Sequence, residues 1–574
     1  MKLRTSSFNL TVLKKDITRF APSWILYTVG LMMTVLVCCQ GVIRSNAAQS
    51  LGSTAYGMAI VSFCYALLNA QLLFGDLFQS RMTNGLHALP LRREEWFSIH
   101  TVAGLLFAVI PNLIMALCMV PFSITVPAMP WLWLLWANGA YVFFFGVAVL
   151  CAMCAGSRFA TVVVYGIVNF GSLLILWLYD TVYRPMLYGL TTDAEPFLKL
   201  SPVSYGTVFI PYSFQWTGGG WGSGMLLLNV EWDMVFYLAV ITAVGILAGA
   251  LALVMYRKRH LETAGDFISA PWLKPLFLTF YTIAMGVVFQ FVLGLFTGTE
   301  WLYLAIGLTV GFLTGQMLLM RTTRIFVKET FRGLAAVLAV TAVTLGLTAM
   351  DPLGLTRWIP EVGEVKHISV TVAGTCVEAD TPEDIELLIQ YHQTVMDNRY
   401  EAMDPGLGNR ASYVTYTMAD DRTEERYYLI PAKGTAHMIL VPLLSRPEVV
   451  LGDLYHKWQE EGAQIDVELF ASKWDGVDVE IFNDEYPLRK FTREDWIAFI
   501  AAVEADCSEN NLIQDRLFHK DYQVMTMNFR WLEVDERGIT FYQNTYLDIY
   551  EESTHVLEWL KNHPRYEPDT DLPK

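Results

Sequence analysis

Ionisable side chains are missing from the long apolar runs of this sequence. Nine runs of about 20 residues contain no Asp, Glu, Lys or Arg away from their ends. Ion-coupled carriers and pumps need an ionisable group at mid-membrane depth to bind and release the driving ion. The absence argues against transport driven by an ion gradient, although a carrier built on backbone carbonyls stays open. Apart from hydroxyls, the polar residues of the runs are Gln40, Asn69, Gln71, His100, Asn112, Asn138, Asn169, Gln290 and Gln316.

A phosphate-binding loop of the form G-x-x-x-x-G-K-[ST] is also absent. The one glycine-dense stretch, TGGGWGSG at 217–224, has no lysine that could reach a phosphate, and we interpret it as a flexible loop. The chain therefore has no ATPase site of its own. An ATP-driven function would require a separate ATPase subunit.

What is present is a strongly apolar first part followed by an acidic second part. The chain is 54% hydrophobic and 17% charged, with a mean hydropathy of +0.36. Residues 1–350 hold 20 Lys and Arg and 13 Asp and Glu, a net charge of +7, whereas residues 351–574 hold 20 and 43, a net charge of −23. This division indicates two different solvents, lipid for the first part and water for the second.

An apolar run of about 20 residues is long enough to cross a hydrocarbon core of roughly 30 Å as a helix. We predict an all-α polytopic membrane domain over residues 20–350, with about nine transmembrane helices, preceded by a cytoplasmic segment over 1–19. A soluble α+β extracytoplasmic domain follows over 351–574. The runs lie at 20–43, 51–75, 97–121, 129–155, 159–180, 233–256, 275–297, 300–320 and 333–350.

Lysine and arginine alternate between the connections. They occur before the first run and in the second, fourth, sixth and eighth connections, while the other connections are poor in them. Such residues stay on the cytoplasmic side of a membrane. The alternation predicts a multi-pass protein of the cell membrane with the N-terminus inside and the C-terminal domain outside.

The first run starts too late and is too long for an ordinary signal peptide, which favours a retained span over a cleaved one. Before it, Leu10, Leu13, Ile17 and Phe20 share one helical face. A helix of this kind suits the inner membrane surface. A merely basic tail is the alternative.

The connection between the second and third runs combines apolar and basic residues. Residues 75–97 read GDLFQSRMTNGLHALPLRREEWF. Asn84 and Gly85 favour a turn or a helix stop, and Pro90 suits the first turn of the next helix. The composition is that of a short rigid elbow that docks into another protein. The alternative is that its charges merely follow the orientation rule.

The stretch DLFQSRMTNGLHALPLRREEWF resembles the first cytoplasmic loop of ABC transporter permeases of the type-2 exporter class, in the Gram-positive form with a C-terminal extracytoplasmic domain. YRKRHLETAGDFISAPWLKP at 256–275 and MDPLGLTRWIPEVGEVKHISV at 350–370 resemble the same group. In that family the loop transmits movements of the ATPase to the spans. The resemblance implies an ATPase-subunit contact at Arg81, His87, Leu89, Pro90, Arg92 and Arg93, and a second cytoplasmic contact at Arg257, Lys258 and Arg259.

By this resemblance the chain is a permease subunit of an ATP-driven exporter and carries no catalytic, cofactor or metal site of its own. Its implied partners are cytoplasmic ABC ATPase subunits, a second permease copy or paralogue, and the lipid bilayer, with no nucleic acid. A membrane-anchored sensor that binds a ligand through the outer domain is the alternative, but no inner loop is long enough for an output domain. An enzyme acting on lipids would need a cluster of Asp, His or Ser that the sequence does not offer.

The last third of the chain alternates strand and helix patterns. Helices are predicted to begin at Thr381, Arg446, Thr492 and near Glu551. We expect two small lobes joined near residues 433–447. Strands are predicted at 365–373, 411–418, 425–431, 464–470, 477–482, 524–534 and 539–546.

Histidines and cysteines of the outer domain do not form a recognisable site. Seven histidines are widely spaced, without an H-E-x-x-H pattern or paired cysteines, and we interpret them as surface residues. Cys376 and Cys507 are the only cysteines outside the apolar runs. Two independent thiols are favoured, and a disulfide between them is the alternative.

Overall fold

The computed structural model divides the chain into two compact units. Unit 1 comprises Met1–Tyr183 and Asp193–Leu347, and unit 2 comprises Arg184–Thr192 and Thr348–Lys574. The short segment 184–192 thus packs with unit 2, whereas the sequence analysis placed it in the membrane domain. The structure describes residues 9–40, 44–79, 82, 92–217, 225–259, 265–295, 300–372, 375–398, 409–431, 435–461, 467–475, 478–480, 489–490, 493–513, 523–534, 540–550 and 552–562.

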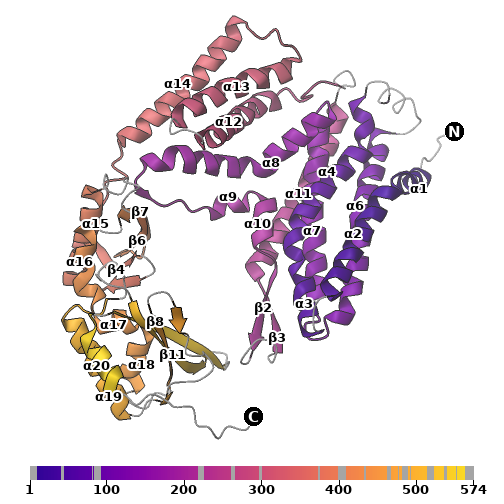
Figure 1. Cartoon of the computed structure of the whole chain (residues 1–574). Helices are drawn as coiled ribbons and strands as arrows, with labels where there is room; N and C mark the ends of the chain where they lie inside the picture. The colour runs from indigo at the N-terminus through magenta and orange to yellow at the C-terminus, as the bar shows by residue number, and fades with distance from the viewer. Residues whose placement is uncertain are drawn as a thin grey trace, which may run out of the picture. The chain divides into compact units, whose positions relative to one another are not determined.

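Within the described ranges of unit 1, nine helices are long and apolar enough to cross a membrane (Figure 1). The prediction of an α-helical, multi-pass membrane protein is confirmed. The helices are α2 (Ala21–Gln40), α4 (Ala55–Leu73), α6 (Arg93–Met119), α7 (Met129–Cys154), α8 (Arg158–Leu178), α11 (Trp232–Lys258), α12 (Leu273–Gly294), α13 (Glu300–Met320) and α14 (Lys328–Met350).

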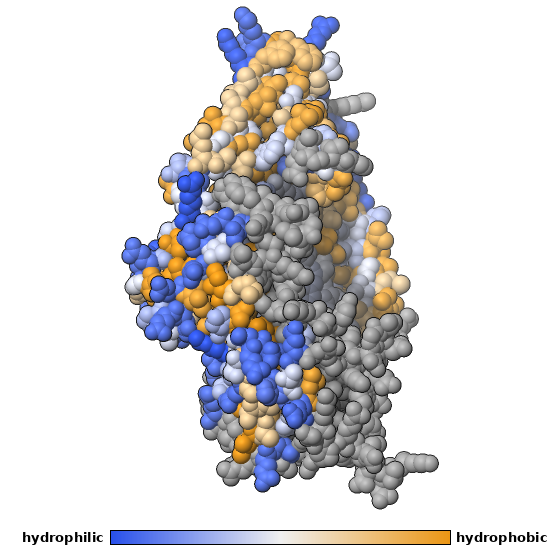
Figure 2. Space-filling model, turned by 60° about the vertical axis from the view of Figure 1, so that its left-hand side comes forward, coloured by the Kyte–Doolittle hydropathy of each residue, from blue (hydrophilic) through white to orange (hydrophobic). Residues whose placement is uncertain are grey.

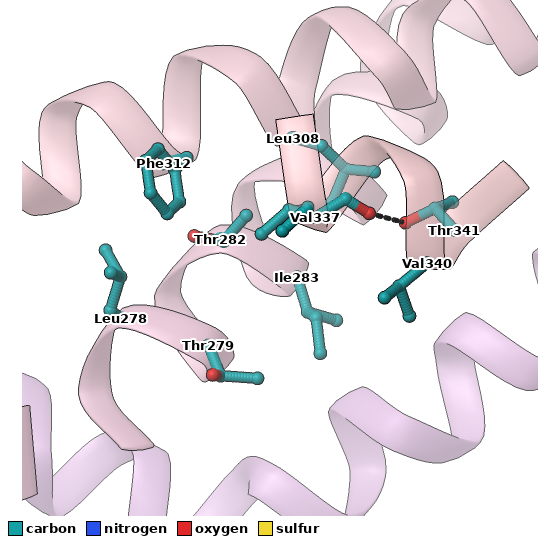
Figure 3. Close-up of a pocket in the computed structure, with 10 residues that line it drawn as sticks. Leu278, Thr279, Thr282, Ile283, Leu308, Phe312, Val337, Val340 and Thr341 are labelled. Carbon is teal, nitrogen blue, oxygen red and sulfur yellow. Dashed lines mark hydrogen bonds between the residues drawn. The ribbon is translucent and has the colours of Figure 1, made fainter. Parts of the chain in front are cut away.

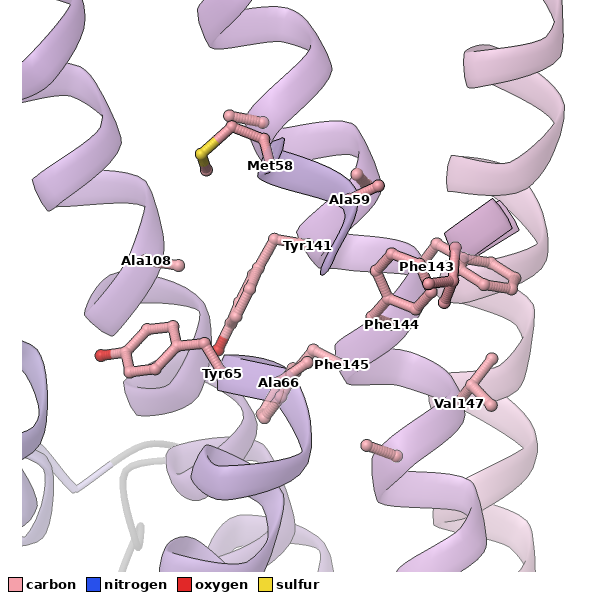
Figure 4. Packing of buried hydrophobic residues seen from close by; sticks show 14 of the residues in the cluster. Met58, Ala59, Tyr65, Ala66, Ala108, Tyr141, Phe143, Phe144, Phe145 and Val147 are labelled. Carbon is pink, nitrogen blue, oxygen red and sulfur yellow. The ribbon is translucent and has the colours of Figure 1, made fainter. Parts of the chain in front are cut away.

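Helices α2, α4, α6, α7 and α11 share one core with α7 at its centre. Aromatic side chains of α4 and α7, among them Tyr65, Tyr141 and Phe144, fill the space between the helices (Figure 4). The closest approach lies between α7 and α11, where a Cβ atom added to Gly146 would lie 2.0 Å from the carbonyl oxygen of Gly245. Glycine is needed here because any side chain would separate the two backbones.

The last three spans form a thinner group. Helices α12 and α13 pack closely through Gly307 and Gly311, whose added Cβ atoms would each lie 2.6 Å from atoms of α12. Helix α14 is the outermost, and none of its most apolar 18 residues is buried. Hydrophobic side chains cover the outer surface of these helices (Figure 2). Such a surface suits contact with lipid.

A short helix, α1 (Leu10–Arg19), precedes the first span as predicted. Its side chains Leu13, Ile17 and Phe20 pack against the core of unit 1, while Leu10 is 71% exposed. The predicted apolar face is therefore correct for three of its four residues. It contacts the neighbouring helices, and Asp16 is buried beside it.

At the end of unit 1 where α7 and α11 begin, a β-hairpin that the sequence analysis missed packs against α3 (Arg44–Ser53). It consists of β2 (Tyr212–Thr217) and β3 (Met225–Val230). The Tyr212 hydroxyl donates a hydrogen bond of 2.7 Å to the carbonyl of Gly52. Residues 218–224 of the glycine-dense stretch lie outside the described residues. Two short helices, α9 (Glu195–Lys199) and α10 (Pro202–Val208), precede the hairpin.

Unit 2 begins with an antiparallel sheet in the order β1-β7-β6-β4-β5, which shares a core with two helices. The predicted strands at 365–373, 411–418 and 425–431 are present. Thr381 caps the predicted helix by accepting a hydrogen bond from the Asp384 amide. The elements are β1 (Gly189–Leu190), β4 (Val365–Val372), β5 (Thr375–Ala379), α15 (Pro382–Asp397), β6 (Asn409–Met418), β7 (Thr423–Pro431) and α16 (Thr435–Leu444).

A second sheet, in the order β10-β8-β11-β12 with β9 paired to β8, has a separate core around Trp496, Phe499 and Phe529. The change from one core to the other falls between Leu444 and Val450, close to the expected junction. Helices and sheets together agree with the predicted α+β class. The elements are α17 (Pro447–Leu451), α18 (Asp453–Glu461), β8 (Val467–Asp475), β9 (Asp478–Glu480), β10 (Arg489–Lys490), α19 (Arg493–Ser508), β11 (Gln523–Val534), β12 (Thr540–Tyr550) and α20 (Thr554–Asn562).

Candidate functional site

The predicted contact residues fall into two groups. Arg92 immediately precedes α6 and Arg93 begins it, whereas Arg257 and Lys258 end α11 and Arg259 follows it. The remaining four predicted contacts lie outside the described residues. These four are Arg81, His87, Leu89 and Pro90.

The structure brings the described residues of the two groups together at one end of unit 1, the upper end of these helices in Figure 1. The Arg93 guanidinium donates hydrogen bonds to the carbonyl oxygens of Arg257, at 3.4 Å, and Arg259, at 3.3 Å. It also lies 6.0 Å from the centre of the Tyr256 ring. The last carbonyls of a helix have no partner within the helix and carry partial negative charge, so a cation is well placed there.

Arg259 faces inward at the same end. Its guanidinium donates to the carbonyl oxygens of Ala152, at 2.8 Å, and Met153, at 3.2 Å, in the last turn of α7. It also donates to the Leu77 carbonyl, at 3.3 Å, in the 3₁₀ turn η1 (Gly75–Phe78). Burial lowers the pKa of Arg259 to about 10, which leaves it charged at neutral pH. Arg259 therefore holds three elements together and presents little of its charge to a partner.

The connection between α7 and α8 pairs with the segment before α12. The Gly265 amide donates to the Gly156 carbonyl at 2.8 Å, and the Ser269 amide donates to the Cys154 carbonyl at 2.9 Å. Ala155 and Ile268 form an antiparallel bridge between them. These bonds connect the ends of α7, α8 and α12. We call this braced region, residues 75–78, 92–94, 152–158, 256–259 and 265–269, the basic end.

Four cations of the basic end face outward. Arg92, Arg158, Arg257 and Lys258 are exposed, and Arg257 forms a 2.8 Å ion pair with Glu94. Both partners of that pair are about half exposed, so it contributes little to stability. We call these four residues the exposed basic surface. Neighbouring elements supply all four, so their arrangement depends on the braces beneath.

A different feature is an apolar cavity of about 320 Å³ between α12, α13 and α14 (Figure 3). Its walls carry no charged side chain. The Thr341 hydroxyl bonds back to the Val337 carbonyl of its own helix at 3.0 Å. The Thr282 hydroxyl has no hydrogen-bond partner among the described residues. Water needs several polar partners to fill a cavity, so this one suits hydrocarbon and does not suit an ion.

Amides that the sequence shows only as scattered residues meet in the core of unit 1. Asn69 donates to the Tyr141 hydroxyl at 2.8 Å, and Tyr141 donates to the Gly104 carbonyl at 2.8 Å. Asn112 accepts from the Tyr27 hydroxyl at 2.8 Å and donates to Asn138 at 2.9 Å. Interhelical hydrogen bonds of this kind fix the packing of helices in lipid. We interpret these amides as structural.

One interpretation of the histidines is wrong. His392 is fully buried in the first core of unit 2, where its ring nitrogens meet the hydroxyls of Tyr416 and Tyr428. Its place on the inner face of α15 was not evident from spacing alone. Cys376 is exposed, Cys507 is buried in the other core, and both are free thiols. The described residues contain no group of three His, Cys, Asp or Glu that could hold a metal ion.

No protein-family model matches the chain, and neither the curated proteins nor the solved structures include a match.

Proposed function

We propose that the chain is the transmembrane permease subunit of an ATP-driven exporter of the ABC type-2 class. In this proposal the basic end faces the cytoplasm and unit 2 lies outside the cell membrane. Two permease chains, identical or paralogous, assemble with cytoplasmic ATPase subunits. The lack of a phosphate-binding loop is consistent with this division of tasks.

The observation that carries the proposal is the bracing of the basic end. A partner that pushes on the exposed basic surface acts on α6 and α11 together, because Arg93 bonds the start of one to the end of the other. Through Arg259 the same displacement reaches α7 and η1. An end built in this way moves as one body, which is what rigid-body transmission of an ATPase movement requires.

The exposed basic surface also suits the partner that the proposal names. Arg92 and Lys258 are exposed and adjoin the ends that Arg93 connects. Guanidinium and ammonium groups at the rim of an interface speed association with an acidic partner surface and set its orientation.

Co-purification tests the proposal. The tagged chain is purified in mild detergent from its native membrane, and co-purifying ATPase is identified by mass spectrometry and nucleotide hydrolysis. The double variant Arg92→Glu/Lys258→Glu should abolish the association, because it reverses two exposed charges while leaving the braces intact. Arg357→Glu, an exposed reversal in unit 2, is the matched control and should leave the complex unchanged.

Insertion and folding of each variant are checked by its thermal unfolding midpoint. A stable ATPase complex that survives the double reversal would contradict the docking assignment. Purification of the wild-type chain without any ATPase, while it transports in liposomes under an ion gradient alone, would contradict the proposed function as a whole.

A further inference from the structure

A carboxylate and an imidazole face each other in a buried site between α1 and α6. Asp16 and His100 are each 5% exposed. Nε2 of His100 lies 3.6 Å from Oδ2 of Asp16. This pair could not be predicted from the sequence, because Asp16 lies in a basic segment before the first span and His100 is a lone histidine in the third.

The other ring nitrogen of His100 decides the protonation pattern. Nδ1 lies 2.9 Å from the carbonyl oxygen of Trp96. A carbonyl oxygen only accepts hydrogen bonds, so Nδ1 carries a hydrogen. In a neutral imidazole Nε2 then has a lone pair, and this lone pair faces a carboxylate oxygen that also only accepts. At 3.6 Å the two atoms face each other favourably only when one further proton is bound to Nε2 or to Oδ2.

Nothing else among the described residues meets this need. Oδ2 of Asp16 is buried and has no hydrogen-bond donor. The imidazole is held in place, since its ring lies 4.1 Å from the Trp96 ring and 5.9 Å from the Phe74 ring.

The charged groups around the pair are few. Arg19 and Lys15 belong to the same helix as Asp16, and Asp76 lies in η1. Arg19 approaches Asp76 at 3.8 Å. Burial raises the pKa of Asp16, and Asp76 raises it further, while His100, Arg19 and Lys15 lower it. The burial that raises the pKa of Asp16 favours its protonated form.

We propose that Asp16 and His100 together bind one proton, and that this proton fastens α1 to α6. Loss of the proton leaves two buried acceptors facing each other, which favours release of α1. Arg19 would leave with α1, and its ion pair with Asp76 in η1 would be lost. Proton binding thus sets the conformation of one edge of the basic end. The inference does not depend on the proposed exporter function.

Hydrogen–deuterium exchange of the full chain in lipid nanodiscs tests the proposal. The peptide that covers residues 10–19 is followed from about pH 5 to about pH 9, a range that lies above the ordinary pKa of aspartate and spans that of histidine. After correction for the intrinsic pH dependence of amide exchange, α1 should be protected at the acidic end. Above the midpoint of this pH transition, the equilibrium constant for release of α1 should rise about tenfold per pH unit, because release is linked to the loss of one proton.

Two variants separate the proton from mere packing. Asp16→Asn supplies an amide that donates to Nε2 without titrating, so α1 should stay closed and the pH profile should be flat. His100→Phe removes the imidazole and leaves the carboxylate alone, so α1 should open at neutral pH and close again as acid protonates Asp16. Lys14→Gln, at an exposed position on α1, should keep the wild-type profile.

Three results would overturn the proposal: a wild-type profile without slope, a slope that survives in Asp16→Asn, and an Asp16→Asn helix that is open at every pH. The last would count against it because an amide donor satisfies the same geometry.

Discussion

Units 1 and 2 bury their polar side chains in different ways. In the core of unit 1, amides and phenols such as Asn69 and Tyr141 bond from helix to helix. In unit 2, the histidine His392 lies in the core between the hydroxyls of Tyr416 and Tyr428. The bonded amide and phenol of unit 1 stay uncharged near neutral pH, whereas the buried imidazole of unit 2 is a base that acid can protonate once the unit unfolds.

The difference agrees with the two solvents that the compositions indicate, lipid for unit 1 and water for unit 2. Helices in lipid gain little from burying apolar surface against each other, so close backbone contact at glycine and interhelical hydrogen bonds hold them together. A unit that folds in water gains directly from burying aromatic surface. That gain is large enough to hold an imidazole out of water when both of its nitrogens are bonded.

The largest expected effect on stability comes from adding a side chain at the close contact between α7 and α11 in unit 1. Gly245→Leu places a side chain where an added Cβ would lie 2.4 Å from the Phe143 Cα, so α11 must separate from α7. We expect a loss of about 3 kcal/mol or more in stability, measured by thermal unfolding in detergent. Gly249→Leu, one turn along the same helix and with open space around it, is the control. Equal midpoints for the two variants would contradict the role of the glycine contact.

Lowering the pH is expected to have a smaller effect on the stability of unit 2. Burial, and to a lesser extent the charge of Arg426, lower the pKa of His392 to about 4, below its ordinary 6.5. Between about pH 4 and pH 6.5 the imidazole of His392 is therefore protonated in the unfolded chain and neutral in the folded unit. This contribution is fully present above pH 6.5, is lost progressively as the pH falls toward 4, and amounts to about 3 kcal/mol at most.

Exchange protection of β6 in the full chain, corrected for intrinsic rates, measures this loss. His392→Gln retains two hydrogen-bonding groups without the titration and should be much less sensitive over the same pH window. If the variant and the wild type lose protection in parallel, another group must be responsible.

The smallest expected effect on stability comes from removing the hydrogen bonds of Arg259 at the basic end. Arg259→Met removes the donor to three carbonyls and should destabilise unit 1 by about 2 kcal/mol. Arg257→Met breaks only an exposed ion pair and should change stability by less than about 1 kcal/mol. Unfolding midpoints in detergent compare the two. A larger loss in Arg257→Met would show that the exposed pair, and not the buried guanidinium, holds this end together.

Much of the secondary structure could be predicted because local signals carry it. The nine spans follow from apolar length, and the start of α15 follows from the capping residue Thr381. The two-residue strand β1 could not be predicted, because it exists only through its pairing with β7. The same holds for β5 and for the hairpin of β2 and β3, whose short strands are fixed by their neighbours.

The candidate site shows the same limit. Basic residues near Arg93 and Arg257 could be assigned to one side of a membrane from their positions between apolar runs. Their mutual contact could not be predicted, since 163 intervening residues separate them along the chain. The inward direction of Arg259 and the pairing of Asp16 with His100 were missed for the same reason.

The sequence by itself determined which segments enter lipid, because hydrocarbon rejects unpaired charge and demands about 20 apolar residues per crossing. It also determined that residues 351–574 hold an excess of acidic residues and no apolar run long enough to cross a membrane. Only the tertiary structure decided which charges face outward at the basic end and which hold helices together. A side chain's contribution depends on the carbonyls, rings and carboxylates that meet it, and those partners come from distant parts of the chain.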